Sequence, residues 1–281
     1  MTASLVLIVL AAALLHAMWN AMAKGGGAPE LSIASYQLFG GLVCAALIPF
    51  VPYPKVESWP YLAASVLIHN AYYFTLSSAY RAGDLSQVYP LFRGLAPVLV
   101  AIGAAVFVGE WLSFGAAVGI GLISLGIISL AFAGGRFGQM SATARNWGLA
   151  TSFLIACYTV TDGIGVRLAG SQASYIVWLF TFEVIPIGIY LLATQPGRWF
   201  EQLKSRALMN VAGGVASSAA YGLVIYAMSF GLLAAVSSIR ETSVIFAAVI
   251  GVLWLKEPFG RARIIAACLV AIGIGLIRYL G

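Results

Sequence analysis

The sequence has very few charged residues. Asp, Glu, Lys and Arg make up 9% of its 281 residues, whereas hydrophobic residues make up 62%. A soluble domain carries ~25% charged residues, so this chain cannot cover itself with a polar surface and its solvent must be lipid. The net charge of +6 comes from single basic residues spread over short loops. This scatter excludes a basic patch for nucleic acid.

Residues that carry enzyme chemistry are also scarce. There are two histidines and three cysteines, and Cys44, Cys157 and Cys268 lie in apolar segments without metal-ligand spacing. The chain has no His-Glu-x-x-His pair, no paired-aspartate cluster, no Gly-x-x-x-x-Gly-Lys phosphate loop and no Gly-x-Ser-x-Gly elbow. We therefore expect no metal, no cofactor, no nucleotide-driven pump and no catalysis.

Long apolar runs dominate what is present. A helix needs ~20 apolar residues to cross a bilayer, and ten such runs are separated by breaks rich in Gly and Pro. The sequence therefore predicts an all-α integral membrane protein with ten transmembrane helices, at about 3–23, 32–51, 59–80, 85–108, 112–132, 147–168, 174–194, 207–229, 232–254 and 260–280.

One stretch of the chain occurs twice, at 83–126 and 231–273. With one gap, the copies align Arg93 with Arg240 and Glu110 with Glu257. Each copy thus has an arginine inside an apolar segment, where a charge is expensive, and a glutamate at the end of that segment.

The repeat extends over both halves of the chain. A shift of 143 residues places 16–24 on 159–167, and a shift of 148 places Tyr73 on Tyr221. The chain is therefore predicted to form one membrane domain of two five-helix repeats, residues 1–135 and 136–281. Because five is odd, the second repeat must enter the membrane from the opposite side, as in many secondary transporters.

Loop charges predict the orientation. Loops after odd-numbered segments hold ten Lys and Arg residues, and the other loops with the tail hold three. This bias places both termini outside the cytoplasm.

Three stretches resemble a known family. They read LLHAMWNAMAK (14–24), VYPLFRGLAPVLVAIGAAVFVGEWLS (88–113) and VSSIRETSVIFAAVIGVLWLKEPFGRARIIAACLVAIG (236–273). The chain resembles the ten-helix EamA-type transporters of the drug/metabolite transporter superfamily along essentially its whole length. The resemblance implies a multi-pass carrier of the inner cell membrane, often an exporter of metabolites, amino acids or drugs, that works by alternating access. Segment nine departs from segment four, because it lacks counterparts of Pro90 and Pro97, which puts a symmetric hinge in doubt.

Arg93 and Arg240 are the first candidates for a binding role. Each lies about a third of the way into its segment, where it would bind an anionic group in a central cavity through bidentate hydrogen bonds. The alternatives are an internal ion pair or snorkelling to an interface. Glu241 follows Arg240 directly, but neighbours on a helix point ~100° apart. Asp162 and Glu183 are therefore the expected partners.

The acids within segments are candidates for coupling. Asp162, Glu183 and Glu241 would each be neutral or paired with a cation in the membrane, and both states suit proton coupling as well as a fixed ion pair. Glu110 and Glu257 lie at segment ends, and we expect capping or gating pairs with Lys256 or Arg261.

Polar and aromatic residues share one face in two segments. His16, Trp19 and Asn20 have i, i+3, i+4 spacing, and His69, Tyr72 and Tyr73 repeat it. Such faces are predicted to line a cavity, although interhelical hydrogen bonding is the alternative. The residues predicted to bind substrate are His16, Trp19, Asn20, His69, Tyr72, Tyr73, Tyr89, Arg93, Tyr221 and Arg240.

The sequence thus predicts a secondary transporter, and more specifically an exporter, of a small polar or amphipathic metabolite with an anionic group. A broad multidrug exporter and an intramembrane enzyme acting on lipid are the alternatives. The expected partners are a small molecule and the lipid bilayer. Gly115, Gly119, Gly273 and Gly275 predict close packing of segments five and ten, or a homodimer face.

Overall fold

The protein is a bundle of helices joined by short turns. A computed structural model describes residues 1–24, 29–83, 85–132, 140–255 and 261–281, and no strand occurs among them. The helices are α1 (Ala3–Lys24), α2 (Pro29–Leu47), α3 (Trp59–Ala82), α4 (Leu85–Val108), α5 (Phe114–Phe132), α6 (Ala142–Leu168), α7 (Gln172–Thr194), α8 (Pro196–Ser205), α9 (Ala207–Met228), α10 (Leu233–Arg240), α11 (Ser243–Leu255) and α12 (Arg261–Leu280), with 3₁₀ turns at Ile48–Phe50 and Val56–Ser58.

Eight of the described helices are long and apolar enough to cross a membrane: α1, α2, α4, α5, α6, α7, α9 and α12. Helix α3 has 24 residues but is not among them, because polar residues such as His69 and Asn70 lower its hydropathy. The segment predicted at 232–254 is two helices, α10 and α11, each too short to span alone. Helix α8 was not predicted.

The break between α10 and α11 contains no proline. Its backbone makes tight i to i−3 hydrogen bonds, from Glu241 N to Ser238 O (3.1 Å) and from Thr242 N to Ile239 O (3.1 Å). Helix α4, in contrast, continues through Pro90 and Pro97, although proline usually kinks or breaks a helix. The interruption therefore lies in the segment whose sequence gave no proline signal.

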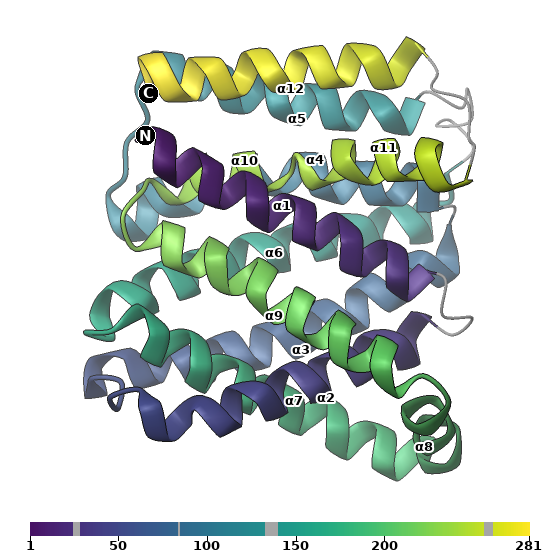
Figure 1. The fold of residues 1–281 in the computed structure, drawn as a ribbon. Coiled ribbons are helices and arrows are strands. Elements are labelled where there is room, and N and C mark those ends of the chain that lie inside the picture. Colours follow the sequence, from purple (N-terminus) through teal and green to yellow (C-terminus); the bar gives the residue numbers. More distant parts are fainter. Residues whose placement is uncertain (25–28, 84, 133–139, 256–260) are drawn as a thin grey trace.

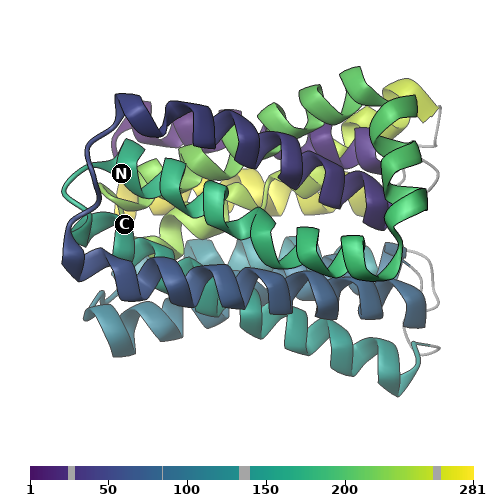
Figure 2. The same ribbon diagram turned by 90° about the horizontal axis from the view of Figure 1, so that it is seen from below.

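The two halves of the chain interlock. Helix α6 packs against α3 and α4, and α1 packs against the corresponding helices of the other half, α9 and the α10–α11 pair. Equivalent helices of the two halves also meet, α2 with α7, α5 with α12 and α4 with α10, and further contacts join α4 with α5 and α2 with α9. Figures 1 and 2 show the result as a single bundle in which neither half packs alone.

The ends of the bundle differ. Both chain termini lie at one end, called the terminal end below, and α8 lies at the opposite end (Figure 1). Helices α5 and α12 lie side by side along one edge. Their approach depends on glycine, because a Cβ on Gly119 would lie 2.7 Å from the carbonyl oxygen of Gly273, and a Cβ on Gly273 would lie 2.6 Å from that of Gly119. The close approach predicted for these glycines thus occurs within one chain.

Gly119→Ala is expected to lower stability by about 1–3 kcal/mol, because a backbone carbonyl cannot move away from the new methyl group. Gly121→Ala, on the same helix, meets nothing within 4 Å and should be neutral or gain up to about 1 kcal/mol from helix propensity. Thermal unfolding of the purified variants in detergent measures both. Equal melting temperatures for the two variants would contradict the packing argument.

Candidate functional site

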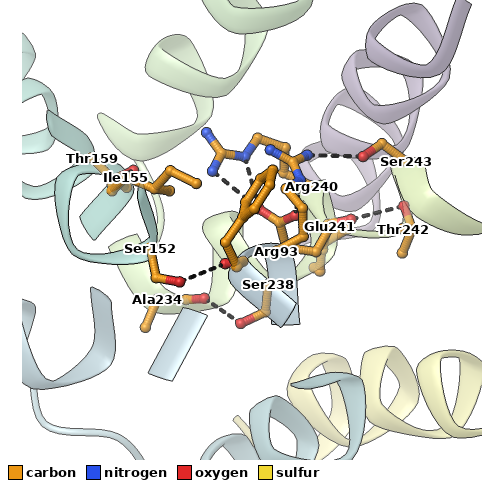
Figure 3. A network of polar contacts seen from close by, with 12 residues as sticks. Arg93, Ser152, Ile155, Thr159, Ala234, Ser238, Arg240, Glu241, Thr242 and Ser243 are labelled. Carbon is orange, nitrogen blue, oxygen red and sulfur yellow. Dashed lines mark hydrogen bonds and ion pairs between the residues drawn. The ribbon is translucent and has the colours of Figure 1, made fainter. Parts of the chain in front are cut away.

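Two arginines and one glutamate form a buried cluster in the middle of the bundle (Figure 3). Glu241 Oε2 lies 2.6 Å from Arg93 Nε, and Glu241 Oε1 accepts hydrogen bonds from Arg240 Nε at 3.3 Å and Nη2 at 3.1 Å. Arg93 Nη2 also donates to Ser243 Oγ at 2.9 Å. Both arginines are 2% exposed and Glu241 is fully buried. Two guanidinium groups share one carboxylate, so the cluster keeps one surplus positive charge.

The expected partners of the arginines were wrong. Glu241 binds both arginines, whereas Asp162 and Glu183 bind neither in the described residues. The 100° rule applies to neighbours on a continuous helix, but α10 ends at Arg240 and the chain turns at Glu241. The turn and the length of both side chains bring the carboxylate against its neighbour's guanidinium.

The other two buried acids bind tyrosines. Glu183 Oε1 accepts a hydrogen bond from Tyr73 Oη at 2.7 Å. Asp162 accepts from Tyr221 Oη at 2.6 Å and from Tyr175 Oη at 3.0 Å. Tyr73 and Tyr221 occupy matching positions in the repeat, so the same tyrosine in each half donates to an acid.

A cavity of about 70 Å³ lies beside the cluster. All ten residues predicted to bind substrate line it, as does Glu183, whereas Asp162 and Glu241 are not part of its wall. The remaining lining residues were missed by sequence reasoning: Ile33, Gln37, Leu76, Tyr80, Tyr158, Phe180 and Ser217. The signal for Gln37 was a lone amide in an apolar segment, and the signal for Tyr158 was its place one turn before Asp162.

Aromatic rings cover the charged groups in this wall. The Arg240 guanidinium lies over Tyr158 and Tyr221, with its Cζ 6.0 and 5.8 Å from the ring centroids. Arg93 Cζ lies 5.8 Å from the Tyr89 ring. The His69 ring stacks on Tyr158 at 4.2 Å. Distances of this order allow cation–π attraction, so the rings hold the guanidinium groups in place where water is scarce.

The residues that line the cavity lie from the middle of the bundle to the end opposite the termini, and none lies at the terminal end. A latch of Glu110 and Arg167 lies there, with Glu110 Oε1 2.6 Å from Arg167 Nη1. Glu110 Oε2 also accepts from the backbone N of Leu233 (2.7 Å), the first residue of α10. Arg167 donates to the carbonyl oxygens of Met228 (3.0 Å) and Gly231 (2.8 Å). The latch thereby ties the ends of α4, α6, α9 and α10 together.

The expected partners of Glu110 were different. We predicted pairs with Lys256 or Arg261, but its partner is Arg167. Glu257 and Lys256 lie outside the described residues. The prediction failed because it considered basic residues near segment ends in sequence, and not which ends meet in space.

Comparison with known proteins gives the following. The model of the EamA-like transporter family matches residues 3–132 and 145–279. A solved structure titled "Crystal structure of protein" has a TM-score of 0.79 and 20% sequence identity, over 100% of this chain and 98% of that one. At this identity the likeness shows a shared fold alone. No curated protein matches the sequence.

Glu241→Gln is expected to destabilise the protein by about 3–5 kcal/mol, because it leaves two buried guanidinium groups without a carboxylate. Arg93→Gln should cost less, since the Arg240–Glu241 pair remains. Melting temperatures in detergent test this order, with the exposed Glu201→Gln of α8 as the control expected to stay near wild type. A Glu241→Gln variant as stable as Glu201→Gln would show that the cluster does not hold the bundle together.

Proposed function

Because the chain belongs to the EamA-like transporter family, we propose that it is a secondary transporter that binds a small molecule with an anionic group in the central cavity. The eight apolar helices make it a multi-pass membrane protein. We further propose that α3 and the α10–α11 pair also cross the membrane, which gives ten spans in two oppositely inserted halves. Export and an inner-membrane location rest on the resemblance of the sequence alone.

One observation supports the anionic group. Arg93 and Arg240 line the cavity, whereas their shared carboxylate on Glu241 lies outside its wall. The surplus positive charge therefore faces the space where a ligand would bind. A carboxylate, phosphate or phosphonate would neutralise it through charge-assisted hydrogen bonds.

The position of the cavity supports alternating access. Its lining runs from Arg240 and Glu183 near mid-bundle to Asn20 and Tyr80, near the ends of α1 and α3 away from the termini. The latch closes the other side. At about 70 Å³ the cavity is far below the ~300–1,000 Å³ typical of ligand pockets, so helices must separate before a metabolite can enter.

A multidrug exporter is the second candidate, because the cavity wall is rich in aromatic residues. Trp19, Tyr72, Tyr80, Tyr89 and Tyr158 are among them, and aromatic faces bind organic cations. In this reading the arginines are structural, and transport of organic cations would survive Arg93→Ala.

The anion proposal predicts that anionic metabolites raise the melting temperature of the purified protein in a library screen. Arg240→Gln should abolish that rise, since the guanidinium facing the cavity is lost. Arg278→Gln on α12, remote from the cavity, is the matched control and should retain it. Uptake of the best ligand into proteoliposomes then tests transport. A rise that persists in Arg240→Gln would refute the role given to this arginine.

The latch is predicted to restrain opening at the terminal end. Glu110→Gln removes one charge of a partly exposed ion pair, worth ~0–1 kcal/mol, so the fold should persist while the end opens more often. Ser237 of α10 is fully buried. In a background without Cys44, Cys157 and Cys268, Ser237→Cys should react several-fold faster with an impermeant thiol reagent when Glu110→Gln is added. The surface change Glu57→Gln is the control, and an unchanged rate would show that the pair is not a restraint.

A further inference from the structure

Glu183 of α7 has an oxygen without a partner. Its Oε1 accepts from Tyr73 Oη at 2.7 Å and from Gln37 Nε2 at 3.4 Å, and Gln37 Nε2 also contacts Tyr73 Oη. Its Oε2 is buried and has no hydrogen-bond partner. The residue is 2% exposed and lines the cavity. The cavity wall thus contains a buried carboxylate oxygen that has no hydrogen-bond partner in the described protein.

No other buried acid in the described residues is in this position. Glu241 lies against two guanidinium groups, and both oxygens of Asp162 accept hydrogen bonds from tyrosines. No Lys, Arg or His nitrogen of the described chain forms an ion pair with Glu183. An ionised carboxylate buried without a cation is strongly unfavourable. Because no basic group of the described chain pairs with it directly, Glu183 is the buried acid best placed to bind a cation from outside the protein.

The available ligands favour a proton over a metal ion. A hard cation such as Ca²⁺ needs six to eight oxygen ligands, and in the described chain only the Tyr73 hydroxyl and the Gln37 amide are in hydrogen-bond contact with the Glu183 carboxylate. No metal-binding group of three His, Cys, Asp or Glu residues occurs in the described part of the chain. A proton needs only one free oxygen, and Glu183 Oε2 has no hydrogen-bond partner.

We propose that Glu183 is a proton-binding site, and that it takes up its proton together with the anion that binds at Arg93 and Arg240. The second part rests on the proposed function. Glu183 and the arginines share one cavity, so an ionised Glu183 balances the surplus charge of the cluster while the cavity holds no anion. When an anion neutralises that surplus, the charge on Glu183 becomes unfavourable and a proton from cavity water bonds to Oε2. Proton and anion thus favour each other's binding equally.

Other ionisable groups near Glu183 define the controls. From the helices packed against α7, α3 contributes His69 and Tyr73, α6 contributes Asp162 and Tyr158, α9 contributes Tyr221, and α2 contributes Cys44. His16 of α1 also lines the cavity, and α8 adds no residue to its wall. Only the two histidines ordinarily titrate near neutral pH, and Asp162 is the one other carboxyl group, so these residues need matched variants.

Infrared spectroscopy of the protein in lipid nanodiscs, without any ligand, tests the proton site directly. The protonated carboxyl band should change with pH in wild type. It should be missing from Glu183→Gln, and should remain in Asp162→Asn. Glu183→Asp, which keeps a carboxyl group, should move the band. A band unchanged in Glu183→Gln, or no titrating band in wild type, would overturn the proposal.

Calorimetric titration with sodium acetate, in buffers of different ionisation enthalpy, tests the coupling. Wild type should take up about one proton per acetate, and its Kd should fall by up to about tenfold per unit decrease in pH. In Glu183→Gln the proton uptake should vanish, whereas in His69→Gln and His16→Gln it should persist. Acetate binding without proton uptake would overturn the coupling.

The outcomes separate this proposal from the proposed function. If acetate does not bind while the infrared band titrates, the anion site fails and the proton site stands. If methylammonium chloride binds to wild type but not to Glu183→Gln, and no carboxyl band titrates, Glu183 is a site for organic cations and the proton proposal is wrong.

Discussion

The structure depends on two buried guanidinium groups that must share one carboxylate. Arg93 belongs to the first half of the chain, and Arg240 and Glu241 to the second. Removing these charges from water costs several kcal/mol per ion, and only a close approach of α4 to α10 recovers it. The turn at Glu241 makes that approach effective, because it presents the carboxylate to both arginines. The join between the halves and the charge of the cavity therefore have the same origin.

Much of the fold could be predicted from hydropathy and repetition. The apolar runs predicted where the helices lie, because a helix that crosses lipid needs an apolar surface. The repeated positions of arginine and glutamate indicated the duplication. The failures have physical reasons. The hydropathy of α3 is low because its polar face meets a cavity and not lipid, and α8 is too short and polar to register as a span. The break after Arg240 contains no proline, and it accompanies an ion pair with Arg93 of a distant helix, which no local pattern reveals.

The sequence indicated many of the residues that line the candidate site, but not which acidic residue pairs with which basic residue. His16, Tyr72 and Arg93 stood out because polar groups at mid-depth need a polar neighbour, and they line one cavity. Which acid meets which base depends on how helices cross. The 100° rule gave the wrong partners for both arginines, and the basic residues at segment ends gave the wrong partner for Glu110. Gln37 was missed because it has no i+3 or i+4 polar companion in its segment, and Tyr158 was missed although it lies one turn before Asp162.

The two halves repeat the arrangement of helices, but they do not repeat the buried acidic residues. Glu241 aligns with Gly94, Asp162 with Trp19 under the shift of 143, and the stretch of α2 opposite Glu183 contains no acid. The three acids that are buried in the described part of the chain therefore all belong to the second half, whereas the tyrosines that bind two of them are repeated. In the proposed alternating-access cycle, equivalent packing would let the bundle open toward either side at similar cost, and the unequal charges would make the two states differ in energy. A latch worth about 1 kcal/mol is small enough for one bound anion to shift that balance, since a ligand moves an equilibrium by its difference in affinity for the two states.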